Sequence, residues 1–305
     1  MKKQEDSLRR FESLSDLHRT LGLPKPLHPL ISLVDNTDNK VAHQPLAGPF
    51  SMNFYKIAYK PNLQGKFKYG QHFYDFDEGG LVFISPNQVS AGQLTNGDHS
   101  GYTLLIHPDF FLTYPLAKHI TQYGFFSYAA NEALHLSDTE KTTIMAIFNF
   151  IGGELNSRID DFSQDVLISQ IELLLNYSNR FYKRQFITRK ALSGDLLQRL
   201  EEVLTTYLNS ETLLHHGIPT VQYLASCVHF SPSYLSDMLR SLIGQNAQQY
   251  IHQKLIEKAK EKLATTSLTV SEVAYELGFE HPQSFSKLFK LKTNLSPLEF
   301  RRSFN

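Results

Sequence analysis

The sequence lacks three features that would each place it in a familiar class of protein. It has one cysteine, Cys227, among 305 residues, which excludes an intrachain disulfide and a cysteine-based metal site and suits a reducing compartment. Its 30 Lys and Arg residues balance its 30 Asp and Glu residues, so a nucleic-acid partner must be met by a local basic patch. No stretch approaches the roughly 18 uninterrupted apolar residues of a membrane span, and the charged start at residues 1–6 has no apolar run behind it. We therefore expect a soluble cytoplasmic protein without a signal peptide or a membrane partner.

Residues 51–107 have the texture of a β-rich domain, and the length of the chain leaves room for a second domain. Short runs rich in Phe, Tyr, Ile and Val are separated by turn residues such as Pro61-Asn62 and Asn96-Gly97. Short strands at regular spacing are typical of a small β-sandwich or barrel. The expected strands lie within residues 51–60, 66–76, 80–85 and 101–107.

Helices are expected on both sides of these strands, because apolar residues recur there at helical spacing. A short helix at residues 11–21 ends before the prolines at positions 24, 26 and 29, which interrupt regular structure. Ser137 and Glu140 form a capping box at the start of a longer helix. The later helices are expected at residues 109–120, 137–156 and 165–184.

The helix expected at residues 165–184 has one apolar face, for which two roles are open. The face can pack on the helix's own domain, or it can pair with a second subunit across a two-fold axis. Residues 190–195, which include Ser193-Gly194, are expected to link this domain to the next. The apolar face comprises Val166, Ile171, Leu174, Leu175 and Phe181.

From residue 196 onward the sequence is helical, and it repeats with a period of about 50 residues in its apolar pattern. Each repeat opens with a threonine N-cap, Thr220 or Thr269. An alanine, Ala225 or Ala274, occupies the same place in both and lets a second helix cross closely, as a helix-turn-helix requires. The apolar positions are Val221, Leu224, Ala225 and Val228 in the first repeat, and Val270, Val273, Ala274 and Leu277 in the second.

A turn and a second helix follow each of these first helices. The turn of the second repeat is Gly278-Phe279, where glycine can take the left-handed conformation, and His229-Phe230 stands in its place in the first repeat. The second helices open at Ser231-Pro232 and at Pro282, with proline at a position that needs no backbone N–H. Their equivalent C-terminal ends are Gly244 and Asn294, both tolerant of positive φ.

The second repeat contains an ordered set of residues: Gly278-Phe279, Phe285, Phe289-Lys290, Asn294, Ser296-Pro297 and Phe300-Arg301. This set resembles the signature of the DNA-binding domain of the AraC family: a Gly-Phe turn, a Phe, a Phe-Lys pair, a Gly, a Ser/Thr-Pro pair and an aromatic-Arg pair. The resemblance covers residues 196–305, with three departures. Asn294 replaces the usual Gly, Leu255 stands where the linker helix often carries Arg, and His281 stands at a helix cap where Asp or Ser is common.

The resemblance implies an all-α domain in which a long helix joins two helix-turn-helix units. The helix expected at residues 246–263 spans ~27 Å at ~1.5 Å per residue. One turn of DNA is ~34 Å long. The two recognition helices can therefore enter successive segments of the major groove on one side of the duplex.

Residues that read bases must point outward near the N-terminal half of each second helix. Gln can pair with adenine and Lys with guanine, Ser is permissive, and Asp237 can accept from cytosine or be repelled by phosphates. Residues 281–305 carry five Lys and Arg residues against the single acid Glu299, so the second unit is expected to supply more of the phosphate attraction. The candidate DNA-binding residues are Ser233, Ser236, Asp237 and Arg240 in the first unit, and Gln283, Ser286, Lys287 and Lys290 in the second.

The resemblance also implies roles for residues 1–190. The corresponding domain of the family is often a cupin-like β-barrel followed by helices, and it senses a small molecule, mediates dimerisation, or does both. The expected fold is thus α+β with two domains: a cupin-like barrel or sandwich with helices at 1–190, and the all-α domain at 196–305. The implied partners are promoter or operator DNA, a small-molecule effector, RNA polymerase and a second copy in a homodimer, with activation as the output.

Two other classes of function are weighed against this interpretation. A metal-dependent cupin enzyme needs a His-x-His pair, a carboxylate and a later histidine; the sequence has no His-x-His before residue 190, and His107 with Asp109 lacks a matching cluster. We therefore expect no catalytic residue, metal or cofactor. A DNA-binding scaffold without an effector stays open, and saturable binding of a small molecule to residues 1–190 would separate it from a sensor. Cys227 is expected to be a packed residue rather than a redox sensor.

Overall fold

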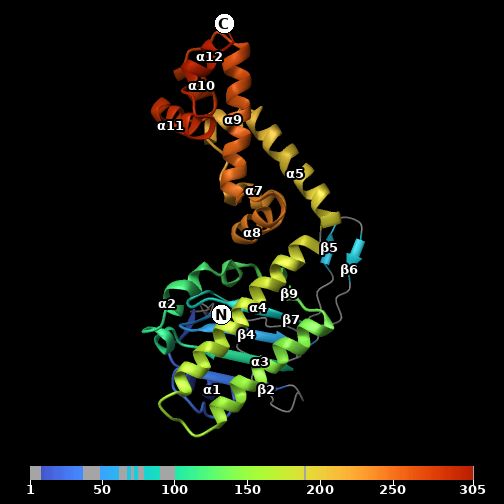
Figure 1. The fold of residues 1–305 in the computed structure, drawn as a ribbon, viewed down its shortest axis with the longest axis vertical. Coiled ribbons are helices and arrows are strands. Elements are labelled where there is room, and N and C mark those ends of the chain that lie inside the picture. Colours follow the sequence, from blue (N-terminus) through green and yellow to red (C-terminus); the bar gives the residue numbers. More distant parts are fainter. Residues whose placement is uncertain are drawn as a thin grey trace, which may run out of the picture. The chain divides into compact units, whose positions relative to one another are not determined.

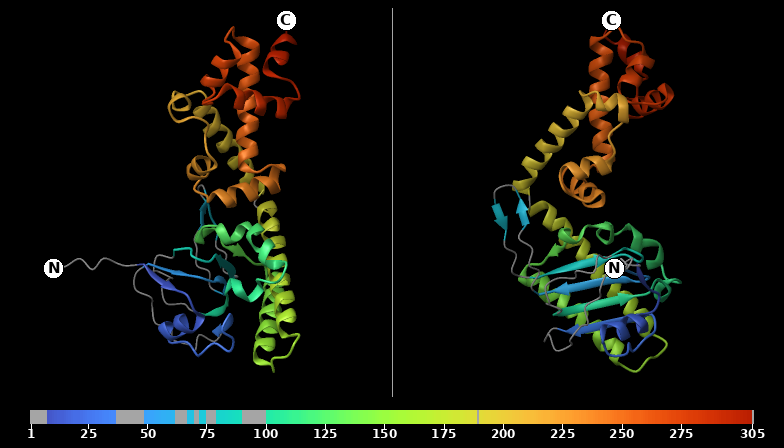
Figure 2. Two further views of the ribbon diagram at one scale, coloured as in Figure 1. Left: turned by 90° about the vertical axis from the view of Figure 1, so that its left-hand side faces the viewer. Right: turned by 180° about the vertical axis from the view of Figure 1, so that it is seen from behind.

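The computed structural model describes residues 8–36, 49–61, 67–69, 72–74, 79–89, 100–188 and 190–304. The chain divides into two compact units, Met1–Gln185 and Phe186–Asn305, and each is described by itself (Figure 1, Figure 2). Within the described ranges, no helix is long and apolar enough to cross a membrane.

The first unit is built on a five-stranded antiparallel sheet. Its central strand places Tyr55, Ile57 and Tyr59 on one face, and Ile57 lies opposite Phe83 and Leu104 of the two neighbouring strands. Because side chains alternate along a strand, these apolar residues give the sheet one continuous buried face. Across the sheet the strands are β2 (Ile31–Asn36), β8 (Gly101–Ile106), β4 (Tyr55–Lys60), β7 (Gly80–Ile84) and β9 (Leu134–His135).

The described strands form an open sheet and no closed barrel. Strands β2 and β9 stand at its two edges, and no pairing within the described residues joins them. The other strands form two separate pairs, parallel β1 (Arg9–Phe11) with β3 (Phe50–Met52), and antiparallel β5 (Phe67–Tyr69) with β6 (His72–Tyr74). The expectation of a cupin-like barrel is therefore not confirmed, and parts of the strand expected at residues 66–76 lie outside the described residues. Strand β2 has no counterpart among the expected strands. It lies just after the three prolines, where no regular structure was expected.

The short N-terminal helix is confirmed as α1 (Leu14–Leu21). The hydroxyl of Ser13 accepts from the backbone N–H of Asp16, and Gly22 ends the helix in the left-handed conformation at a φ of 71°. Leu14 and Leu17 of this helix pack with residues of β1 and β3 on the sheet face opposite Tyr55, beside Ile84 and Leu105.

Two long helices, α3 (Asp138–Asn156) and α4 (Ser163–Thr188), provide the cover for the other face of the sheet (Figure 1). The expected capping box of Ser137 and Glu140 opens α3. Of the predicted apolar face of α4, Ile171, Leu174, Leu175 and Phe181 are buried in their own unit, whereas Val166 is 38% exposed. This packing favours the own-domain role for that face.

The single helix expected at residues 109–120 is wrong, because Pro115 interrupts it. The segment instead holds a 3₁₀ turn at Pro108–Phe111, the short helix α2 (Leu116–His119) and a 3₁₀ turn at Ile120–Gln122. Two further 3₁₀ turns follow at Gly124–Ser127 and Ala130–Glu132.

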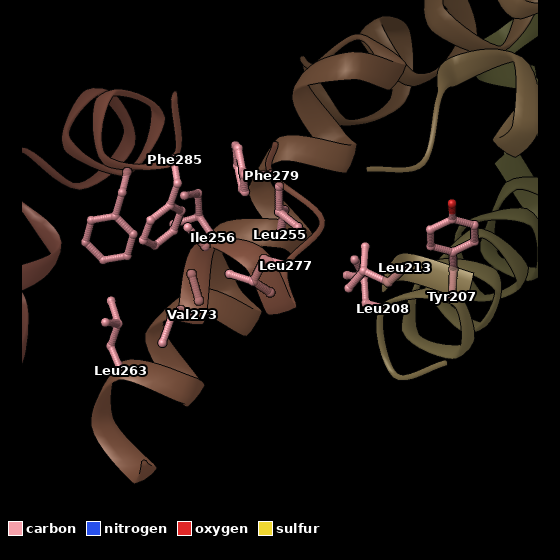
Figure 3. Packing of buried hydrophobic residues seen from close by; sticks show 13 residues of the cluster. Tyr207, Leu208, Leu213, Leu255, Ile256, Leu263, Val273, Leu277, Phe279 and Phe285 are labelled. Atoms are coloured by element: carbon pink, nitrogen blue, oxygen red, sulfur yellow. The ribbon is translucent and has the colours of Figure 1, made fainter. Parts of the chain in front are cut away.

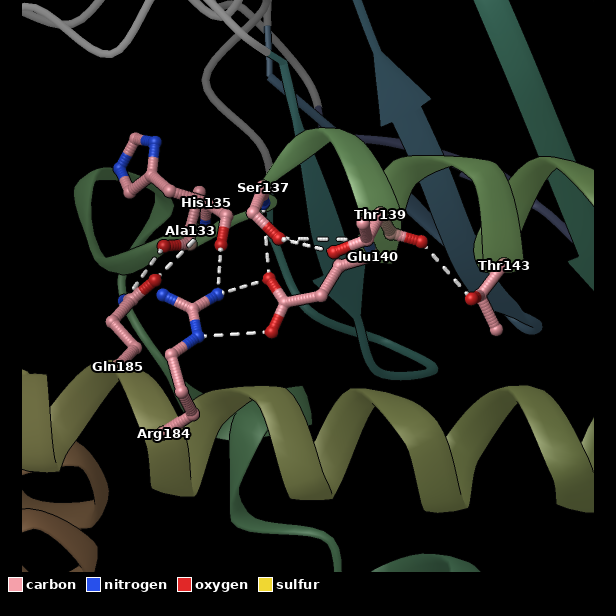
Figure 4. A network of polar contacts seen from close by, with 8 residues as sticks. All are labelled: Ala133, His135, Ser137, Thr139, Glu140, Thr143, Arg184 and Gln185. Carbon is pink, nitrogen blue, oxygen red and sulfur yellow. Dashed lines mark hydrogen bonds and ion pairs between the residues drawn. The ribbon is translucent and has the colours of Figure 1, made fainter.

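A polar network ties α3 and α4 to the edge strand β9 (Figure 4). Arg184 of α4 donates through Nε to Glu140 Oε1 at 2.9 Å and through Nη2 to the carbonyl of His135 at 2.8 Å. Gln185 accepts from the backbone N–H of His135 at 2.9 Å and donates to the carbonyl of Ala133 at 3.3 Å. Strand β9 therefore has its outer edge satisfied by side chains rather than by another strand.

The second unit is entirely helical. Residues 190–195, predicted as a linker, are instead the first turns of a helix. Glycine in a helix interior costs about 1 kcal/mol relative to alanine, and Ser193-Gly194 nonetheless lie within this helix. The helices are α5 (Lys190–Leu208), α6 (Thr212–His216), α7 (Val221–Cys227), α8 (Pro232–Ile243), α9 (Ala247–Thr265), α10 (Val270–Glu276), α11 (Pro282–Thr293) and α12 (Pro297–Arg302).

Candidate nucleic-acid interface

Helices α7 and α8 form the first helix-turn-helix. The hydroxyl of Thr220 accepts from the backbone N–H of Tyr223 and caps α7. His229 follows the helix at a φ of 60°, in the left-handed region that favours glycine. The backbone N–H of Phe230 then donates to the carbonyl of Ala225 at 3.0 Å, and Ala225 itself is fully buried.

Helices α10 and α11 repeat this arrangement. Thr269 and Glu272 form the predicted capping box, whose hydrogen bonds hold the pKa of Glu272 below its ordinary value. Gly278 follows the helix at a φ of 76°, and the backbone N–H of Phe279 donates to the carbonyl of Ala274 at 3.0 Å. The same hydrogen bond therefore closes both turns, and the internal repeat seen in the sequence is a repeat of structure.

The four candidate residues of the first helix-turn-helix all lie on α8. Ser231 caps this helix through the N–H of Tyr234, and Gly244 ends it at a φ of 73°. The inner face packs into the unit through Tyr234, Leu235, Met238 and Leu239. Asp237 and Arg240, one turn apart, form an ion pair with Nη1–Oδ1 at 2.5 Å. Ser233 and Ser236 lie outside the buried face, on the same helix.

The four candidate residues of the second helix-turn-helix all lie on α11. Phe285 and Phe289 are fully buried and fix the inner face, while Gln283, Lys287 and Lys290 are exposed and Ser286 is half-buried. His281 stands at the N-cap without a side-chain cap hydrogen bond, and Asn294 ends the helix at a φ of 62°. The departures at both ends of α11 are thus compatible with the helix.

Helix α9 joins the two helix-turn-helix units. It has 19 residues, which corresponds to a length of about 28 Å, and Asn246 with Gln249 forms a capping box at its start. Leu255 is fully buried on α9 within the core of the second helix-turn-helix (Figure 3). The departure from arginine at this position is therefore a packing residue.

The core of the second helix-turn-helix extends to helices that the sequence did not point out. Tyr207 and Leu208 of α5 and Leu213 of α6 belong to the same buried cluster (Figure 3). The Tyr207 hydroxyl donates to the carbonyl of Gly217 at 3.0 Å. A Cβ on Gly278 would lie 3.0 Å from Gly217, so glycine at position 278 is required both by φ and by this close approach.

One cation that the sequence offered as a phosphate contact is used inside the unit. The Nε of Arg301 donates to the carbonyl of Leu263 at 3.2 Å and so caps the last turn of α9. The Phe300-Arg301 pair thereby holds α12 against α9. The exposed cations of residues 281–305 are Lys287, Lys290, Lys292 and Arg302.

Comparison with known proteins supports the same region. Residues 224–303 match a family model described as a helix-turn-helix domain. The chain is 31% identical over 83 residues to the uncharacterized HTH-type transcriptional regulator YisR of Bacillus subtilis, covering 27% of this chain and 29% of that protein. It is 28% identical over 140 residues to the arabinose operon regulatory protein of Salmonella typhimurium, covering 46% of this chain and 47% of that protein.

Among solved structures, the C-terminal domain of the response regulator yesN from Fusobacterium nucleatum is 30% identical, with coverage of 35% of this chain and 98% of that chain and a TM-score of 0.31. The chain spans between 29% and 54% of the length of the first curated relatives it matches. Together with the signature residues of α10 to α12, the family model and the curated relatives show that the C-terminal part of this chain is a helix-turn-helix domain of the AraC type.

Proposed function

We propose that the chain is a sequence-specific DNA-binding regulator of transcription, with α8 and α11 as its two recognition helices. The observation that carries the proposal is the pair of turns closed by the same hydrogen bond, Phe230 to Ala225 and Phe279 to Ala274. Equivalent turns present equivalent helices, and α9, which joins the two helix-turn-helix units, has 19 residues and so a length of about 28 Å, compared with ~34 Å for one turn of DNA.

The two recognition helices are proposed to read DNA unequally. On α11, we propose that Gln283 pairs with adenine and Lys287 with guanine, and that Lys290 contacts phosphate. On α8, Ser233 and Ser236 are permissive. Asp237 is held by Arg240, and this pair either accepts from a cytosine amino group as a unit or keeps the helix away from phosphates.

Selection of bound fragments from a random-sequence DNA pool, followed by salt titration on the winner, tests this proposal. A recovered motif about two helical turns long, or a direct repeat of such motifs, is the expected result. Binding that depends steeply on salt but yields no motif would leave only the phosphate term, and the sequence-specific function would then be wrong.

We further propose that the protein acts as a homodimer through the outward side of α4. Four of the five residues of the predicted face are buried, but the fifth, Val166, is 38% exposed. Leu173 (45% exposed) and Phe162 (71% exposed), which directly precedes α4, recur with Val166 at helical spacing on the outward side. Sedimentation of the full chain and of Phe162→Asp tests this: we expect a dimer that becomes monomeric on substitution. A monomeric unsubstituted chain at micromolar concentration contradicts it.

Three further parts of the proposal rest on the family resemblance alone. They are control by a small-molecule effector bound to Met1–Gln185, activation as the output, and RNA polymerase as a partner. Transcription reconstituted with polymerase on the selected DNA tests the output. A rise in transcript supports activation, and a fall makes the protein a repressor.

A further inference from the structure

The first unit contains a half-open groove between the edge strand β2 and the C-terminal half of α3. Its volume is about 530 Å³, within the range of small-molecule sites. Residues 31–35 of β2 form one wall, and residues 148–156 of α3 form the second. The segment that carries Pro24, Lys25, Pro26 and Leu27 closes the third side.

Two adjacent glycines, Gly152 and Gly153, leave the α3 side of this groove without side-chain atoms at these positions. A Cβ on Gly152 would lie 3.2 Å from Leu33 Cδ2, so packing against β2 accounts for that glycine. A Cβ on Gly153 would meet nothing within 4 Å, and packing therefore does not account for it. Since glycine within a helix is destabilising, a helix that carries it without a packing reason fits a surface that must stay open.

Three acceptors line the groove: the carboxylate of Asp35 and the amide oxygens of Asn149 and Asn156. The Tyr102 hydroxyl, on a ring stacked against Phe148, donates to Asn149 Oδ1 at 2.7 Å. Asp35 lies opposite Tyr102 in the pairing of β2 with β8. Burial, and then the charge and hydrogen bond of Asp35, raise the pKa of Tyr102. Asn156 uses its Nδ2 on the carbonyl of Gly152 at 2.7 Å, which leaves its carbonyl oxygen for the groove.

Groups that can donate also line the groove: the amide nitrogen of Asn149 and the side chains of His18 and Lys25. His18 is buried, with Nδ1 at 2.6 Å from the carbonyl of Pro24 and Nε2 at 3.0 Å from the hydroxyl of Ser32. Because a carbonyl oxygen can only accept, Nδ1 donates to Pro24, and both ring nitrogens are engaged. Lys25 is exposed on the segment that closes the third side of the groove. The C-terminal end of α3 adds the negative end of the helix dipole.

We propose that this groove binds a small organic amine, with its ammonium group at Asp35, Asn149 and Asn156 and its apolar body against Leu27 and Leu33. A carboxylate, amide oxygens and a helix C-terminus together favour a donor-rich cation over an anion or a neutral molecule. Leu27 is 65% exposed and offers the apolar contact. The inference deepens the effector part of the proposed function by naming a site and a ligand class, and it does not depend on DNA binding.

The test is calorimetric titration of the full chain, without DNA, using three probes of one shape: cyclohexylamine, cyclohexanol and cyclohexanecarboxylate. We expect saturable binding of the amine at about millimolar concentration, as suits so few atoms, and no binding of the carboxylate. Asp35→Asn should weaken the amine about tenfold. Gly153→Leu, which fills open space, should abolish binding while the thermal midpoint is kept.

Ala146→Leu, at an exposed position two turns earlier on the same helix, is the matched control and should bind the amine normally. Equal binding of amine and carboxylate, amine binding unchanged in Gly153→Leu, or no binding of any probe would each overturn the proposal. DNA selection with the same Gly153→Leu protein is a separate measurement. Loss of the DNA motif in that selection would count against the regulator function, whereas loss of amine binding in the titration concerns the groove alone.

Discussion

At the scale of single residues, the two equivalent turns of the repeat use different residues at the position with positive φ. Both need a residue at positive φ, and the chain uses His229 in one and Gly278 in the other. Histidine tolerates this region better than a β-branched residue but still carries strain. We expect His229→Gly to stabilise the protein by about 0.5–1 kcal/mol, since the relief of left-handed strain outweighs the entropy of glycine.

The matched substitution Gly278→Ala should act in the opposite direction. Its Cβ would meet Gly217 and the carbonyl of Leu213 at 3.0 Å, and we expect a loss of about 1–3 kcal/mol. Urea unfolding of both variants measures the difference. A stabilised Gly278→Ala protein would mean that the approach of α6 to this turn is wrong.

Lys287 is the residue on which base reading by α11 can be tested most directly. Its side chain is exposed on the outer face of the recognition helix. We expect Lys287→Ala to cost about 1–3 kcal/mol of binding free energy and to relax preference at one base pair. Competition binding on the selected site and on single-base variants measures both. Equal loss on selected and random DNA would reduce Lys287 to a phosphate contact.

At the scale of elements, α10 and α12 both start with a capping box whose glutamate accepts from a backbone N–H. The hydrogen bonds from Thr269 and from Ser296 lower the pKa values of Glu272 and Glu299. A lowered carboxylate pKa in the folded state stabilises the fold above the ordinary glutamate pKa of about 4.3. That contribution is lost as the pH falls through the lowered value.

We therefore expect the second unit to lose stability on acidification through these two boxes. In the double variant Glu272→Gln and Glu299→Gln, the amide keeps an acceptor at each box but cannot titrate, so the free energy of unfolding should fall less steeply below pH 5. Chemical denaturation followed by tyrosine fluorescence at several pH values measures this. Identical pH profiles for the two proteins would place the acid sensitivity elsewhere.

How far the sequence predicts these elements depends on whether their signals are local. Caps, turns and the apolar stripe of a helix involve residues a few positions apart, so both helix-turn-helix units and α1, α3 and α4 were predictable. The contact of Gly278 with Gly217 and the cap of Arg301 on Leu263 join residues far apart in the sequence. Nothing in local spacing reports them, and the open edges of the sheet could not be told from a barrel for the same reason.

At the scale of the whole molecule, the two halves of the DNA-binding domain differ in charge. Residues 196–280 carry six Lys and Arg residues against nine Asp and Glu residues, whereas residues 281–305 carry five against one. In the first recognition helix the cation Arg240 is already paired with Asp237. We therefore expect the second helix-turn-helix to supply most of the phosphate attraction, and the first helix-turn-helix to add selectivity with little net attraction for phosphate.

This asymmetry predicts how salt acts on three variants. Each phosphate neutralised contributes about 0.9 to the slope of log K against log salt concentration. Lys290→Ala should reduce the slope by about that amount, because Lys290 is exposed on α11. Arg240→Ala should change it much less, since its charge is offset by Asp237, and the isosteric Asp237→Asn should steepen it by releasing Arg240. Fluorescence anisotropy on the selected site between 50 and 300 mM salt, about the range over which counterion release dominates, measures all three. Equal slopes for Lys290→Ala and Arg240→Ala would mean that both units hold phosphate alike, and that the Asp237–Arg240 pair opens when DNA binds.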